Sequence, residues 1–158
     1  LIIYYENFKS VKISSKIFET AAELIKKGGM HQQIINNLYK TTEGEINFLS
    51  AIFQNLEIDD TKVSCAMLDS NDFQNFTETE ASSVMEKIKT MGMQNDLLVL
   101  WKSHASEPTI KGFFYSKKLN LINKIAEIQK KTAKNDWVFL SMPGLDINLI
   151  KDQILKLL

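Results

Sequence analysis

Cationic and hydroxyl side chains gather near the middle of the sequence, in the stretch KGFFYSKK. Charge, hydroxyl groups and backbone N–H groups could together hold a phosphate there, through Lys111, Tyr115, Ser116, Lys117 and Lys118. An aromatic ring of the same stretch could stack on a base. A second interpretation is that the rings share a buried strand face while the lysines are solvated and guard a sheet edge. The residues alone leave both interpretations open.

Other chemistry is not predicted. His31 and His104 lie far apart and have no partner at the spacing of metal ligands. The acidic residues at 59–60, 69–72 and 78–80 lack the spacing of a calcium loop, and we interpret them as solvated caps of turns and helices. No glycine-rich phosphate loop or nucleophile motif occurs. We therefore expect no catalytic residue, no metal site and no cofactor in this chain.

Composition limits the classes of partner. The 158 residues suffice for one domain or two small lobes. The net charge is zero, so no overall field draws the protein to nucleic acid or anionic lipid, and any anion binding must be local. Cys65, the single cysteine, lies in an apolar run and is typical of a buried thiol in a reducing compartment. No apolar run approaches membrane-spanning length. We expect a cytoplasmic protein and, since the chain begins on leucine, a part of a longer one.

The elements that position the cationic stretch are two strands and a helix. An apolar run predicts a strand over residues 97–102, Glu107 and Pro108 predict a turn, and a second strand is expected over residues 109–116. An amphipathic helix follows from about residue 120. These three elements form a small core of their own, with the lysines at its rim.

The remaining elements are expected to lead into this unit or cover it. A strand is predicted over residues 1–5, followed by a helix capped by Ser14 or Ser15, a helix over residues 31–39, and a third helix capped by Thr41 or Thr42. The third helix carries an apolar stripe that includes Ile46, Ile52 and Phe53. A hairpin over 55–68, a turn or short helix over 69–76, a helix from Thr77 or Thr79, a strand over 137–142 and a helix capped by Asp146 follow. The pattern predicts an α+β fold: a helical linker, then a mixed sheet of about five strands covered by helices.

Two stretches resemble a known family. FETAAELIKKGGMHQQIINNLYKT is similar to the linker of DHH-family phosphoesterases, the RecJ-like group that includes oligoribonucleases and phosphoadenosine-phosphate phosphatases. KGFFYSKKLNLINKIAE is similar to the substrate-binding domain of that family, where lysine and glycine begin a strand that ends in a serine and basic motif. The two stretches occur in the family's order.

The resemblance implies a division of roles. Family members have an N-terminal catalytic domain that binds two metal ions, usually manganese, and a C-terminal domain that grips the rest of a nucleotide substrate. Residues 1–44 would be the end of the catalytic domain and the linker, and residues 45–158 the substrate-binding domain. Tyr115, Ser116, Lys117 and Lys111 would bind a nucleotide or short single-stranded nucleic acid. Manganese is expected only in a complete, hydrolytic family member, with its catalytic domain.

Departures from the family pattern predict degenerate sites. Tyr5 stands about where a metal-binding aspartate is expected, and a tyrosine does not replace a hard anionic ligand. Tyr115 stands where the family's strand usually presents an arginine. KKTAKNDW replaces a glycine-rich loop that lets backbone approach phosphate. We therefore expect no catalysis by this chain alone. The alternative is a non-enzymatic interaction or scaffolding module of the same fold, which serves to form a homodimer.

Overall fold

The computed structural model describes residues 13–38, 40–58, 60, 62–68, 76–104, 107–131, 133, 136–144 and 146–158. The chain divides into two compact units, Leu1–Thr41 and Thr42–Leu158, and each is described by itself. The strand predicted over residues 1–5, with Tyr5, lies outside the described residues, as does most of the segment predicted as a turn or short helix over 69–76.

The first unit contains helix α1, Ser15–Lys26, and helix α2, His31–Leu38. Ser14 is the N-cap residue of α1, as predicted, and has an extended conformation, although its side chain forms no capping hydrogen bond. The end of α1 follows the prediction. Gly28 adopts a left-handed φ of 91°, and the Gly29 N–H donates to the Leu24 carbonyl at 2.9 Å, which satisfies a carbonyl of the last turn.

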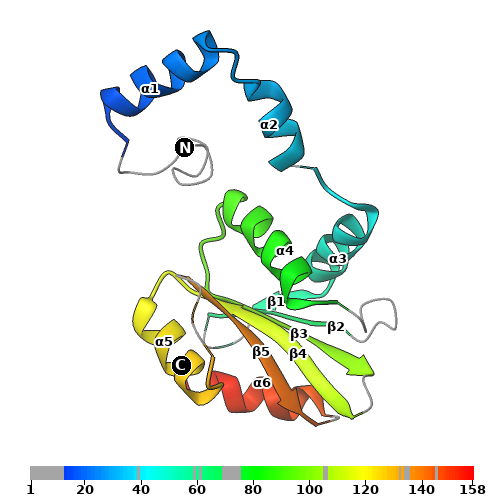
Figure 1. The fold of residues 1–158 in the computed structure, drawn as a ribbon. Coiled ribbons are helices and arrows are strands. Elements are labelled where there is room, and N and C mark those ends of the chain that lie inside the picture. The colour runs from blue at the N-terminus through cyan, green and yellow to red at the C-terminus, as the bar shows by residue number, and fades with distance from the viewer. Residues whose placement is uncertain are drawn as a thin grey trace. The chain divides into compact units, whose positions relative to one another are not determined.

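The second unit is built on a five-stranded mixed sheet (Figure 1). Its strands are β1 Leu56–Ile58, β2 Ser64–Leu68, β3 Leu97–His104, β4 Pro108–Tyr115 and β5 Trp137–Pro143, and they lie side by side in that order. β2 and β3 are parallel, and every other neighbouring pair is antiparallel. The prediction of an α+β fold with a mixed sheet of about five strands is therefore confirmed.

Two helices cover each face of the sheet (Figure 1). On one face lie α3, Glu43–Gln54, and α4, Glu78–Thr90, and on the other lie α5, Leu119–Ile128, and α6, Ile147–Leu155. Thr42 and Thr77 form capping boxes with Glu45 and Glu80, and Asp146 accepts hydrogen bonds from the first N–H groups of α6. Because these side chains satisfy otherwise unpaired N–H groups, the sequence fixes where the three helices begin.

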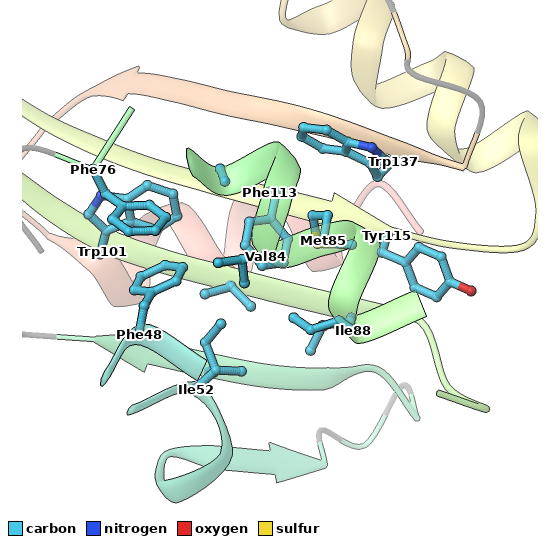
Figure 2. Packing of buried hydrophobic residues seen from close by; sticks show 14 of the residues in the cluster. Phe48, Ile52, Phe76, Val84, Met85, Ile88, Trp101, Phe113, Tyr115 and Trp137 are labelled. Atoms are coloured by element: carbon cyan, nitrogen blue, oxygen red, sulfur yellow. The ribbon is translucent and has the colours of Figure 1, made fainter. Parts of the chain in front are cut away.

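The core under α3 and α4 is aromatic. Figure 2 shows Phe48, Trp101 and Phe113 packed together, and the rings of Phe48 and Trp101 meet edge to face with centroids 5.3 Å apart. On α3, Phe48 and Ile52 are fully buried, whereas Ile46 is 55% exposed and Phe53 is 41% exposed. Only part of the predicted apolar stripe thus faces the core.

Polar side chains join α3 to α4 at the edge of this core. The Glu45 carboxylate accepts a hydrogen bond from Ser83 Oγ and pairs with Lys87 Nζ at 3.0 Å. Burial alone would raise the pKa of Glu45, but hydrogen bonds from Ser83, the Thr42 N–H and Lys87, together with the lysine charge, hold the pKa below its usual value. The carboxylate therefore stays ionised and ties the start of α3 to the middle of α4.

The central strands are buried on both sides. Val99, Trp101 and Phe113 face α3 and α4, while alternate residues of the same strands, among them Leu98, Leu100 and Phe114, face α5 and α6. Between them, Gly112 pairs with Leu100 of β3 and Leu140 of β5. A Cβ atom at this position would lie 2.2 Å from the Val99 carbonyl oxygen and 2.7 Å from Leu100 Cδ2. The strands can pack in this register only with glycine there.

Substitution of Gly112 by alanine tests this packing. We expect Gly112→Ala to lower the free energy of unfolding by about 2 to 3 kcal/mol, because backbone of β3 or β4 must move to relieve the clash. Gly44→Ala is the matched control. Gly44 lies in the first turn of α3 with space for a methyl group, so we expect a small gain of roughly 0.5 kcal/mol. Urea unfolding of both variants is the measurement, and equal stability changes would contradict this account of β3 and β4.

Candidate functional site

The predicted binding stretch lies where β4 ends and α5 begins. β4 ends at Tyr115, one residue earlier than predicted, and Tyr115 pairs with Leu97 of β3 and Trp137 of β5. The residues that precede these two partners, Asp96 and Asp136, therefore lie on either side of Ser116. The Ser116 N–H donates to the Asp136 carbonyl at 2.9 Å. Ser116 is fully buried between two aspartates.

Ser116 also sets the start of α5. Its Oγ accepts a hydrogen bond from the Lys118 N–H at 3.0 Å, and the Lys118 carbonyl accepts from the Leu121 N–H at 3.0 Å. The N–H groups of a first helical turn have no intrahelical partner and attract anions. Residues 116–119 thus form a corner, here called the β4–α5 corner, with backbone donors at the start of the helix.

Each flanking aspartate is paired with a lysine. Lys118 Nζ lies 3.2 Å from Asp96 Oδ2, and Lys89 Nζ, from α4, lies 3.3 Å from Asp136 Oδ2. Burial would lower the pKa of Lys89, but the carboxylates of Asp136 and Glu86 outweigh it, so the pKa is raised and Lys89 stays charged. The two pairs cancel most of the charge around Ser116.

Lys117 differs from these lysines. It is exposed and makes no ion pair with the part of the chain that the structure describes. Lys117 directly follows Ser116 in the chain. Lys117 is therefore the cation of the β4–α5 corner that remains available to an anionic ligand.

Lys111 lies away from the corner. It is half-buried on β4, opposite Trp101 and Ser141, and four residues before Tyr115, which corresponds to about 14 Å along an extended strand. The structure thus brings Tyr115, Ser116 and Lys117 to one strand end and leaves Lys111 near the middle of the strand. Phe113 lies between them on the same strand face and is fully buried under α3 and α4, so a ligand at the strand end does not reach Lys111 along β4.

The aromatic rings of the stretch are not exposed. Phe113 is fully buried and Tyr115 is 5% exposed, both in the core under α3 and α4. In Figure 2 the Tyr115 hydroxyl points away from the other labelled side chains. Burial, and then the charge of Asp136, raise the pKa of Tyr115, with Asp96 adding to the effect and Lys89 opposing it. Tyr115 therefore offers a protonated hydroxyl as a donor, and neither ring can stack on a base as the chain is folded.

Three charged residues of the site were not predicted from the sequence. Asp96 and Asp136 each immediately precede a strand, and they flank Ser116 only because β3 and β5 are both antiparallel neighbours of β4. Lys89 comes from a helix that precedes β3 in the chain. In the sequence, both aspartates stand directly before apolar runs that predict strands. Their position beside Ser116 could be predicted only with the order of the strands in the sheet, which the sequence does not show.

The described part of the chain contains no group of three His, Cys, Asp or Glu side chains placed to hold a metal ion. Among its helices, none is long and apolar enough to cross a membrane.

Comparisons with known proteins identify the fold. No family model matches the sequence, and no curated protein matches it. The structure is similar to the crystal structure of an exopolyphosphatase-related protein from Bacteroides fragilis, with a TM-score of 0.72 and 15% sequence identity. The match covers 98% of this chain and 47% of that one. The two proteins share a fold over nearly all of this chain, which spans about half the length of its structural neighbour.

The raised pKa of Tyr115 predicts that the wild type and a Tyr115→Phe variant differ in stability at high pH. Because the folded state holds the phenolic proton more tightly than the unfolded chain, this contribution to stability is present below the ordinary pKa of 10.0 and is lost as the pH rises through the folded value. We expect Tyr115→Phe and the wild type to have similar urea midpoints at pH 7. At about pH 11 the variant should be the more stable. The same difference at both pH values would contradict this environment for the hydroxyl.

Proposed function

We propose that this chain is the linker and substrate-binding region of a DHH-like phosphoesterase, of the oligoribonuclease or phosphoadenosine-phosphate phosphatase type. The observation that carries the proposal is the fold shared with an exopolyphosphatase-related protein over 98% of the chain. The family resemblance of the linker and of the stretch around Tyr115 adds to it, because the resembling residues lie in the helices of the first unit and at the β4–α5 corner. The ligand class is a phosphate-bearing nucleotide or short single strand.

The β4–α5 corner supplies the means of binding. Lys117 contributes charge, the first turn of α5 contributes N–H donors, and the Tyr115 hydroxyl is a further donor at the same strand end. Ser116 is fully buried, so it acts by holding the Lys118 N–H and the start of α5 rather than by touching the ligand. Lys111 lies about 14 Å from the strand end, beyond the buried Phe113, so the proposal places the ligand at Tyr115 and Lys117 and not at Lys111.

Hydrolysis would require residues beyond this chain. In the resembling family, two metal ions held by an N-terminal catalytic domain carry out the chemistry, and only residues 1–44 correspond to the end of that domain and the linker. A catalytic domain is therefore the partner that this region would serve in a longer protein. The proposal assigns no catalytic residue to the 158 residues.

A specific observation favours a second function. Aspartates flank Ser116 on both sides, both are neutralised by lysines of the chain, and the rings of Phe113 and Tyr115 are buried. A phosphate approaching the corner meets two carboxylates as well as Lys117. If these features outweigh the donors, the fold serves as a scaffold or dimerisation module without a ligand.

Titration with AMP and with a trinucleotide separates the two functions. With ¹⁵N-labelled protein at low salt, we expect the largest amide shifts at Lys117, Lys118 and Leu119. Lys117→Ala should weaken both ligands about fivefold, roughly 1 kcal/mol, since it removes the unpaired cation. Lys111→Ala should leave both affinities unchanged, because the buried Phe113 separates Lys111 from the corner.

The control is Lys156→Ala, which removes an equal charge from an exposed position at the end of α6. It should leave both affinities unchanged. Absence of shifts with either ligand at millimolar concentration would reject the binding function and favour the scaffold.

A further inference from the structure

Asp136 connects the two faces of the sheet. Its backbone carbonyl accepts the Ser116 N–H at 2.9 Å, and its side chain pairs with Lys89 at the C-terminal end of α4 at 3.3 Å. From Ser116 the contacts continue through Oγ to the Lys118 N–H, the N-cap of α5. A helix that covers one face is therefore linked by three successive contacts to the start of a helix that covers the other.

The two aspartates beside Ser116 are held differently. The side chain of Lys118, the partner of Asp96, is 66% exposed although Asp96 itself is 14% exposed, so solvent screens the lysine end of this pair. The side chain of Lys89, the partner of Asp136, is 19% exposed. Among the residues that the structure describes, the buried Asp136 Oδ1 atom has no hydrogen-bond partner, so Lys89 is the charged group there that compensates for the partial burial of this carboxylate.

Within the described ranges, loss of Lys89 would leave neither oxygen of Asp136 with a partner. A partly buried carboxylate without a partner moves toward water, because the desolvation cost of its charge is no longer offset. Movement of residue 136, either because its carboxylate is unpaired or because an alanine there has no side chain to hold it to α4, would displace its backbone carbonyl, and with it the hydrogen bond that holds Ser116. The start of α5 depends on Ser116, so the displacement would reach the N–H donors of the β4–α5 corner.

We propose that Lys89 and Asp136 are positioning residues for a phosphate bound at the β4–α5 corner: their ion pair holds Ser116, and Ser116 holds the first turn of α5. Neither residue touches the ligand. The inference rests on the proposed binding function and adds two residues, one from α4 and one from the segment before β5, that control the geometry of that site.

If Asp136 acted only through its charge, its removal would change the phosphate affinity in the opposite direction. Removing a carboxylate near a phosphate site strengthens binding by Coulomb's law, whereas removing a positioning contact weakens it. Asp96 is the matched control, since it flanks Ser116 from the other strand and is paired with the exposed Lys118. Its removal frees a lysine and takes away a negative charge, without breaking the link from α4.

The experiment measures binding of inorganic phosphate and of AMP to the full 158-residue chain by ¹⁵N NMR. We expect Asp136→Ala to weaken both ligands about fivefold or more and Asp96→Ala to strengthen them two- to fivefold. Lys89→Met should weaken binding. Lys89→Arg, which keeps the charge and can still reach Asp136, should restore it to within about twofold.

Amide hydrogen exchange provides a readout that does not require a ligand. In Asp136→Ala and Lys89→Met we expect the Ser116 and Lys118 amides to exchange about tenfold faster or more, while Leu100 in the middle of β3 is unchanged. Asp96→Ala should leave the Ser116 amide as in the wild type. Faster exchange at Leu100 as well would indicate general destabilisation and would count against a positioning role.

The outcomes separate this inference from the proposed function. Phosphate binding by the wild type, together with tighter binding by Asp136→Ala or unchanged exchange at Ser116, would overturn the positioning role and leave the binding function intact. Failure of the wild type to bind phosphate or AMP would overturn the proposed function, and the inference with it.

Discussion

The close packing of β3 against β4 is the constraint on which the second unit depends. Gly112 lets the Val99 carbonyl approach within a distance that no other residue permits, and both strands then bury side chains on their two faces. Two buried faces require two covering layers, which α3 with α4 and α5 with α6 provide (Figure 1). At its end β4 pairs with both neighbouring strands, through Tyr115 with Leu97 and Trp137. The candidate site is therefore placed by the core and not by a flexible loop.

Much of this arrangement was predictable because local signals agree with the tertiary structure. Thr42, Thr77 and Asp146 cap helices with their side chains, and the apolar runs of β3, β4 and β5 are buried as expected. The prediction was less accurate where apolar residues surround a helix. On α3, Ile46 is exposed and Ile52 is buried, although both are isoleucines. Which of them is buried depends on the side from which the sheet packs against the helix, and neither residue type predicts that side.

The candidate site shows the same limit. The sequence placed Tyr115, Ser116 and Lys117 at a strand end, and the structure agrees, but it separates them from Lys111 and buries the rings that were candidates for base stacking. Whether these four residues bind a ligand stays a prediction. Asp96, Asp136 and Lys89 surround Ser116 through strand order and helix placement, which are properties of the assembled sheet. They change the electrostatics of the corner from simply cationic to nearly neutral, with Lys117 as its available charge.

The central claim is that this region binds a nucleotide phosphate without hydrolysing it. The most direct measurement incubates the 158-residue chain with manganese and short oligoribonucleotides or phosphoadenosine phosphate, and follows release of mononucleotide and phosphate beside a protein-free blank. The account predicts release no faster than in the blank, with the amide shifts at Lys117 and Lys118 still present when the same ligands are added. Steady turnover that stops when the manganese is chelated would contradict it.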